Sequence, residues 1–149
     1  MDKVKDETRR ARRHETQEVF TPATVVDYML DKIPFEEFRP LDKTWLDNSC
    51  GNGNILERII LRRAKAQAEL TDEAILAIYS TTFGTELMED NTLECRQRLF
   101  DLAIHELGYQ GIPDRLGKIL EHNIVCTDTF KWNYEDWCPM VEAAQLKLL

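Results

Sequence analysis

The sequence lacks any apolar run approaching the roughly 20 residues that a transmembrane helix needs. Its charged opening, MDKVKDETRR, is not followed by the apolar core of a secretion signal. Cysteine and histidine are also scarce: four cysteines form no CxxC pair, and three histidines complete no zinc-ligand spacing. We therefore expect a cytoplasmic protein with reduced thiols, without a disulfide framework and without metal ligands.

Positive charge is in short supply as well. The net charge of −8 argues against a free-standing nucleic-acid binder, because neutralising phosphates needs a basic face. The exception is a basic arm, residues 1–16, on an otherwise acidic single domain, residues 17–149. The arm is either a solvated or disordered segment or a contact to nucleic acid or an acidic partner. Its basic residues are Lys3, Lys5, Arg9, Arg10, Arg12 and Arg13.

Helical and strand-like segments alternate along the domain. Apolar spacing and turn signals predict helices over 23–32, 54–68, 74–80 and 90–107, a last helix from about Pro139, and strands over 44–47, 81–87 and 123–127. The first helix should bury one stripe made of Val25, Val26, Met29, Leu30 and Ile33. A loop is predicted between the last long helix and the last strand, around Gly111, Pro113 and Gly117. This order is typical of an α/β fold with a parallel sheet flanked by helices.

Acidic residues end all three predicted strands: Asp47, Glu86 and Asp128. Gly51 and Gly53 follow the first of them and allow a tight turn that approaches a ligand closely. Taken singly, each feature is also explained by an ordinary turn or a surface carboxylate. Together they predict one ligand site, in which Glu86 accepts ribose hydroxyls and Asp128 accepts from an adenine amino group. Leu87 or Phe130 would pack on the ring.

Four segments, EVFTPATVVDYMLDKI, LDNSCGNGNIL, FGTELMEDN and NIVCTDTF, resemble the N-terminal part of the gamma-type N6-adenine DNA methyltransferases. Those enzymes occur in restriction-modification systems and phages. The resemblance spans roughly residues 17–131, with the four motifs in the expected order. It implies a truncated Rossmann-like, S-adenosylmethionine-dependent methyltransferase fold. Asn48 and Asn52 depart from the Pro and Ser/Thr that are usual there, but both tolerate turns.

The resemblance also implies S-adenosylmethionine as the cofactor. Thr21 and Pro22 would then contact the methionine carboxylate region, and the turn after Asp47 would wrap the methionine. Glu86 would hold the ribose, and Asp128 the adenine amino group. The complete predicted cofactor-binding set is Phe20, Thr21, Pro22, Asp47, Ser49, Cys50, Gly51, Gly53, Glu86, Leu87, Asp128, Thr129 and Phe130.

One expected motif is missing. The family has Asn/Asp-Pro-Pro-aromatic about 20 residues after the third acidic strand end, to grip the flipped target base. Here the segment reads TFKWNYEDWCPM, and its only proline, Pro139, follows a cysteine. The sequence therefore offers no catalytic residue.

The strand order implied by the resemblance leaves strand 44–47 at an open edge. We expect that edge to be covered by the C-terminal tail with Trp132 and Trp137, or by another chain. A homodimer is the preferred partner, and a methylase or restriction subunit is the second.

Two functions stay open. The chain is either the cofactor-binding part of a DNA adenine methyltransferase whose partner supplies the missing motif, or an inactive remnant. A remnant would sequester cofactor or inhibit a restriction or modification complex. Hydrolysis of the cofactor is the weakest idea, because no acid–base pair is dedicated to it.

Overall fold

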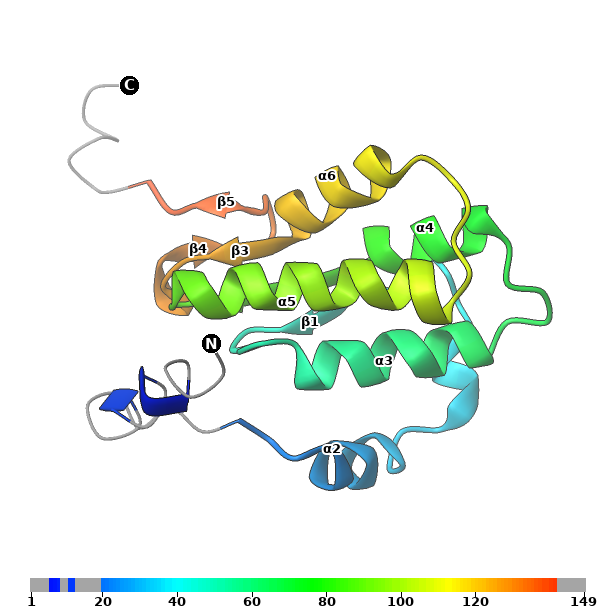
Figure 1. Cartoon of the computed structure of the whole chain (residues 1–149), viewed down its shortest axis with the longest axis horizontal. Coiled ribbons are helices and arrows are strands. Elements are labelled where there is room, and N and C mark those ends of the chain that lie inside the picture. The colour runs from blue at the N-terminus through cyan, green and yellow to red at the C-terminus, as the bar shows by residue number, and fades with distance from the viewer. Residues whose placement is uncertain (1–5, 9–10, 13–19, 142–149) are drawn as a thin grey trace.

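The computed structural model describes residues 6–8, 11–12 and 20–141. Its centre is a three-stranded parallel sheet of β1 (Trp45–Asp47), β2 (Thr82–Glu86) and β3 (Ile124–Cys126), in the order β1-β2-β3. Helices flank this sheet (Figure 1), so the predicted α/β class and parallel sheet are confirmed. Each strand lies within its predicted range.

The helices follow the predicted alternation, with one addition. Pro113 occupies the first turn of α6, where its missing N–H costs no hydrogen bond, and Leu116 and Leu120 lie buried on one face of that helix. The predicted loop around Pro113 and Gly117 is therefore wrong. The helices are α2 (Ala23–Leu30), α3 (Asn54–Lys65), α4 (Asp72–Ser80), α5 (Glu89–Asp101) and α6 (Pro113–Asn123), with shorter turns η1 (Phe35–Phe38), η2 (Leu102–Glu106) and η3 (Thr129–Lys131).

Local signals explain where helices begin and end. The Thr71 hydroxyl accepts a hydrogen bond from the Ala74 N–H at 3.1 Å and caps α4. The single π turn η2 extends α5 as far as Glu106, and Gly108, with φ +75°, follows in the left-handed region. None of the helices in the described ranges is both long and apolar enough to span a bilayer.

The expected buried stripe of α2 is only half right. Val26 and Leu30 are buried, whereas Val25 and Met29 are exposed. The reason is that α2 packs on α3 with one narrow side and has no second neighbour of comparable extent among the described elements. An amphipathic pattern alone does not show how wide the covered side is.

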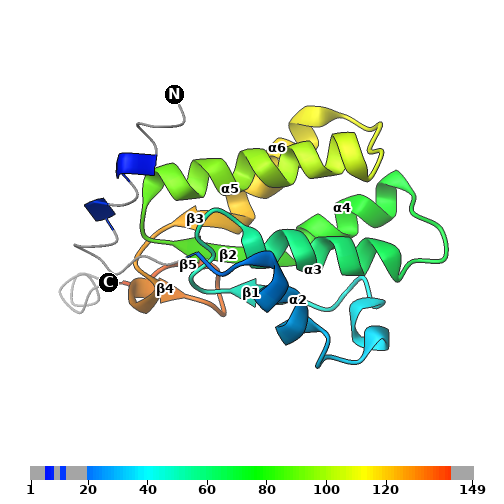
Figure 2. The same cartoon turned by 60° about the horizontal axis from the view of Figure 1, so that its bottom comes forward.

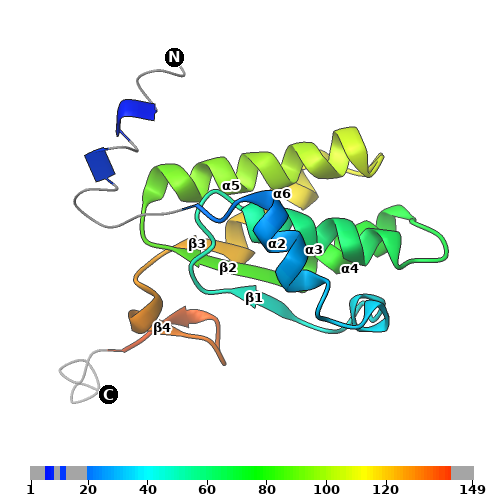
Figure 3. The same cartoon turned by 90° about the horizontal axis from the view of Figure 1, so that it is seen from below.

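The two faces of the sheet are covered differently. α3 and α5 lie on one face, and a hairpin of β4 (Trp132–Asn133) and β5 (Cys138–Pro139) lies on the other (Figure 3). The Trp137 ring packs edge-on against the ring of Phe83 in β2, with the two ring centroids 4.7 Å apart. The Trp137 Nε1 donates to the His122 carbonyl at 2.7 Å.

Two expectations about the edge and the tail change as a result. Within the described residues no strand pairs with the outer edge of β1, and Trp137 packs one strand away, so the predicted cover of that edge by the tryptophans is not confirmed. Leu46 of β1 is 48% exposed. Pro139 belongs to β5 rather than to the start of a helix, and residues 142–149 lie outside the described part.

Buried polar side chains close the amino-terminal end of the sheet. Arg63 donates to the Ile78 carbonyl at 2.9 Å and to the Thr82 hydroxyl at 3.1 Å. Asn123 donates from Nδ2 to three backbone carbonyls at 3.0–3.2 Å, including that of Thr82. Burial lowers the pKa of Arg63 to about 10, and its side chain stays cationic at neutral pH. Carbonyl acceptors from separate elements thus tie α3, α4 and β2 together.

Candidate functional site

The three acidic residues that follow or end the strands lie at the carboxyl end of the sheet. Asp47 is level with Gly84 of β2, and Glu86 is level with Cys126 of β3. Asp128 follows two residues after Cys126. The carboxyl ends of the three strands therefore point the same way, with the start of α5 beside them (Figure 2). The sequence prediction that these acids share one end of the sheet is confirmed.

A glycine turn links β1 to α3 and is held against β2. The Cys50 N–H donates to the Thr85 carbonyl at 3.0 Å, and the Gly53 N–H donates to the Cys50 carbonyl at 2.9 Å. Gly51 and Gly53 have φ of +54° and +96°, a region that side chains disfavour. A Cβ on Gly53 would stand 2.9 Å from the Cys95 sulfur. The turn therefore needs glycine for both its backbone and its surroundings.

The segment before α2 lies directly on this turn. A Cβ on Gly51 would stand 3.1 Å from the Phe20 ring. The Asn54 amide, at the start of α3, donates to the Thr21 carbonyl at 3.0 Å. Pro22 then precedes α2 as its cap residue. The structure thus brings the predicted residues Phe20, Thr21 and Pro22 beside the glycine turn, and it adds Asn54, whose position at a helix start was the only sequence signal.

One carboxylate oxygen of Asp47 has no partner among the residues that the structure describes. Its Oδ1 accepts from the Ser49 N–H at 3.1 Å. Its Oδ2 is buried and has no hydrogen bond within the described residues. Burial raises the pKa of Asp47, and the hydrogen bond from Ser49 opposes part of that rise. A buried acceptor in this state is destabilising unless a donor reaches it.

Glu86 ends β2 and is oriented by the start of α5. Its Oε1 accepts from the Leu87 N–H at 3.0 Å, and its Oε2 accepts from the Asn91 amide at 2.9 Å. Leu87 beside it is 63% exposed. Asn91 is buried and was missed by sequence reasoning, because nothing in the helical pattern distinguishes it.

Asp128 acts as a local cap after β3. Its Oδ1 accepts from the Phe130 N–H at 3.0 Å and begins the short η3 turn. The Thr129 hydroxyl is hydrogen-bonded to the Tyr134 hydroxyl, which also donates to the Thr129 carbonyl at 2.8 Å. The Phe130 ring projects from this turn and is 86% exposed. Tyr134, a further residue that sequence reasoning missed, thus stiffens the turn that carries Phe130.

Cys50 is a buried structural thiol. A hydrogen bond with Cys95, then burial, and then the nearby acids raise its pKa. The thiol is therefore neutral at physiological pH and is a poor nucleophile. Gly84 packs tightly against the same sulfur, since a Cβ there would stand 2.9 Å away. Cys50 belongs to the framework of the glycine turn.

No known protein family, curated protein or solved structure matches this chain.

Proposed function

We propose that the chain binds S-adenosylmethionine at the carboxyl end of its sheet, in a Rossmann-like methyltransferase arrangement reduced to three strands. The observation that carries the proposal is that Asp47 and Glu86 end two neighbouring parallel strands and Asp128 follows the third, beside a left-handed glycine turn. In open parallel sheets, ligands bind beyond the carboxyl ends of the strands.

The site fits the amino-acid part of the cofactor. A cationic amine suits the buried Asp47 Oδ2, which has no donor within the described residues. Gly53, the residue before α3, gives that helix no side-chain cap, and the positive end of a helix favours a carboxylate. Amino and carboxylate groups on one carbon would thus meet two complementary features of the same turn.

The site also fits adenosine. Glu86 would accept the ribose hydroxyls, and Asp128 would accept from the adenine amino group through Oδ2. Leu87, directly after Glu86, and Phe130, two residues after Asp128, are large apolar side chains that are left exposed. Stacking a base between them would remove both from water, which favours binding.

Methyl transfer would need groups that this sequence does not contain. All five prolines follow Thr, Ile, Arg or Cys, so no Asn/Asp-Pro pair exists to hold a target base. As a split DNA adenine methyltransferase, the protein would obtain those groups from a partner chain, and the open edge of β1 with exposed Leu46 is where a partner would pair. The alternative is an inactive cofactor-binding remnant with a sequestering or inhibitory role.

Calorimetric titration with S-adenosylmethionine tests the binding proposal. The full chain should bind, and Glu86→Ala should weaken binding at least roughly tenfold, because an ionised acceptor shared by two hydroxyls is lost. Glu89→Ala is the matched control: it removes the same charge from the first turn of α5, where Glu89 is exposed. No heat of binding at high protein concentration would refute the proposal, as would equal losses in the two variants.

A second experiment separates the two functions. The purified chain is incubated with labelled cofactor and DNA, alone and with proteins captured from the native host. Transfer that appears only with a captured partner supports the split enzyme. Cofactor binding without transfer under either condition supports the remnant.

A further inference from the structure

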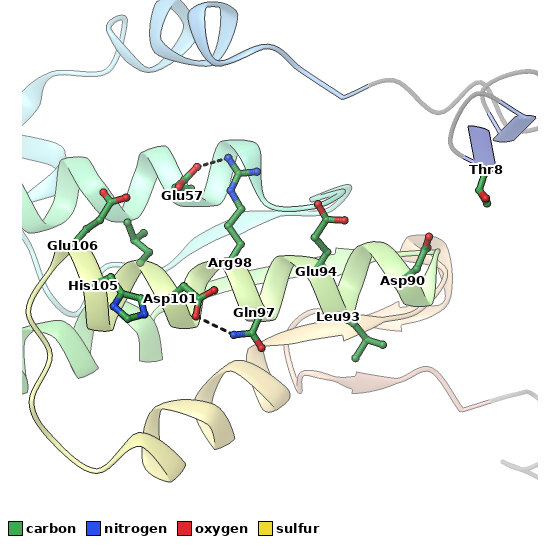
Figure 4. A pocket seen from close by; sticks show the side chains of 11 residues that line it. Thr8, Glu57, Asp90, Leu93, Glu94, Gln97, Arg98, Asp101, His105 and Glu106 are labelled. Carbon is green, nitrogen blue, oxygen red and sulfur yellow. Dashed lines mark hydrogen bonds and ion pairs between the residues drawn. The ribbon is translucent and has the colours of Figure 1, made fainter. Parts of the chain in front are cut away.

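A groove of about 830 Å³ runs along α5, from Asp90 in its first turn to Glu106 in η2 (Figure 4). Carboxylates at Asp90, Glu94 and Glu106 line it. Leu93 contributes exposed apolar surface between them. The groove follows the length of the helix, whereas the proposed cofactor site lies at the strand ends.

Positive charge within the groove is already engaged. Arg98 also lines it, but its guanidinium donates to the Asn54 amide oxygen at 2.5 Å and forms an ion pair with Glu57 (Figure 4). The groove therefore keeps an excess of carboxylates and favours a cationic occupant with some apolar surface.

The described part of the basic arm already reaches one end of this groove. Arg12 binds both carboxylate oxygens of Asp90, with Nη1 and Oδ1 2.7 Å apart. Its side chain is only 11% exposed, although it belongs to an arm. Thr8 lines the groove at the same end (Figure 4). The remaining basic residues, Lys3, Lys5, Arg9, Arg10 and Arg13, lie outside the described part of the chain.

We propose that this groove is the docking site of the chain's own basic arm, residues 1–16, anchored by the ion pair between Arg12 and Asp90. The reach is sufficient: Asp90 to Glu106 spans about 24 Å of helix, and the 11 residues before Arg12 extend up to ~36 Å. The charges are complementary, since the arm carries six Lys/Arg against four Asp/Glu in its sequence, and carboxylates line the groove. Docking would hold these cations away from other polyanions.

Limited trypsin digestion of the full chain tests this proposal, with cleavage after basic residues of the arm followed by mass spectrometry. A synthetic peptide of residues 1–16 gives the cleavage rate of an undocked arm under each condition. At about 20 mM salt the arm should be cleaved several-fold more slowly than the peptide, and at about 500 mM salt the two rates should converge, because screening weakens the ion pairs.

Two variants locate the contact without removing a trypsin site. Asp90→Asn and Glu94→Gln should each raise cleavage of the arm roughly two- to fivefold at low salt, as expected for loss of a partly exposed ion pair. Glu89→Gln is the control, because it removes an exposed charge next to Asp90 that does not line the groove. Its cleavage rate should equal that of the unaltered chain.

Three results would overturn the proposal. The arm could be cleaved as fast as the peptide at low salt, or Glu89→Gln could act as strongly as Asp90→Asn. Protection could also rise with protein concentration, which would show that the groove holds the arm of a second copy. Thermal unfolding followed by circular dichroism verifies that both groove variants are folded, and the salt comparison on the unaltered chain needs no variant.

Discussion

At the amino-terminal end of the sheet, the buried side chains of Arg63 and Asn123 donate to several backbone carbonyls, and of their donor atoms only Arg63 Nε lacks an acceptor within the described residues. At the carboxyl-terminal end, the buried Oδ2 of Asp47 lacks a donor within the same residues. The large apolar side chains Leu87 and Phe130 also stand exposed at the carboxyl-terminal end. The first arrangement stabilises the fold. The second is unfavourable by itself, and a ligand would make it favourable.

The largest effect should come from breaking the closed end. Arg63→Met should lower the free energy of unfolding by about 3–5 kcal/mol, because it leaves buried carbonyls without donors and removes links between α3, α4 and β2. Urea denaturation measures this change. Arg58→Met is the control on the same helix, with an exposed 3.8 Å ion pair to Asp27, and should change stability by less than about 1 kcal/mol. Equal effects of the two variants would show that the buried contacts contribute little.

Gly53→Ala tests the glycine turn at the open end. Both its φ of +96° and the 2.9 Å approach to the Cys95 sulfur disfavour a side chain. We expect Gly53→Ala to lower the free energy of unfolding, measured by denaturation, by roughly 2–3 kcal/mol and to abolish cofactor binding. Gly108→Ala is the matched control: its φ of +75° is similar, but nothing lies within 4 Å of a Cβ there. Gly108→Ala should lower the free energy of unfolding by only about 1 kcal/mol. Equal costs would show that contact with Cys95 is unimportant.

Asp47→Asn should sharpen the comparison by separating stability from binding. Burial raises the pKa of Asp47, so the folded state binds a proton more tightly than the unfolded state does. The ionised form therefore destabilises the fold above that raised pKa, and the penalty disappears as the pH falls through it toward the ordinary value of 3.8.

At pH 7, Asp47→Asn should thus raise the free energy of unfolding by up to about 1 kcal/mol while weakening S-adenosylmethionine binding. The gain should vanish near pH 3.5. Urea denaturation at both pH values and calorimetry provide the measurements. A variant that loses stability at pH 7 would show that Asp47 serves the fold rather than a ligand.

The smallest change in stability should come from Phe130→Ser. Its ring is 86% exposed, so the free energy of unfolding should stay within about 0.5 kcal/mol of the original. Cofactor binding should nevertheless weaken by roughly fivefold or more, since stacking on the adenine is lost. Ile112→Ser removes another exposed apolar side chain, 67% exposed and located before α6, and should leave binding unchanged. Similar binding by both variants would remove Phe130 from the site.

The alternating helices and strands could be predicted well from the sequence, because strong apolar periodicity is a local signal that does not depend on which other elements pack nearby. It failed where tertiary contacts decide. α6 was taken for a loop since Pro113 and Gly117 suggested one, although Leu116 and Leu120 have helical spacing. The exposure of Leu46 depends on which strands pair with β1, and that is not encoded in the residue itself.

The candidate site was predictable as a set of positions but not as a set of contacts. Glycines and acids after predicted strands indicate a site at the carboxyl end of the sheet, and the structure brings Asp47 and Glu86 to that end. Asn91 donates to Glu86, five residues before it, and Asn54 donates to the Thr21 carbonyl, 33 residues before it. The sequence does not show that either contact forms. The burial of Arg63 also could not be foreseen, because its carbonyl acceptors come from separate elements.

The most direct test of the account is a backbone NMR titration of the full chain with S-adenosylmethionine, which compares the two ends of the sheet in one experiment. We predict saturable shifts at residues 47–54, 86–91 and 128–130, with little change around Arg63, Thr82 and Asn123. Shifts confined to other parts of the chain, or none at millimolar cofactor, would contradict the claim that the carboxyl end of the sheet is a binding site.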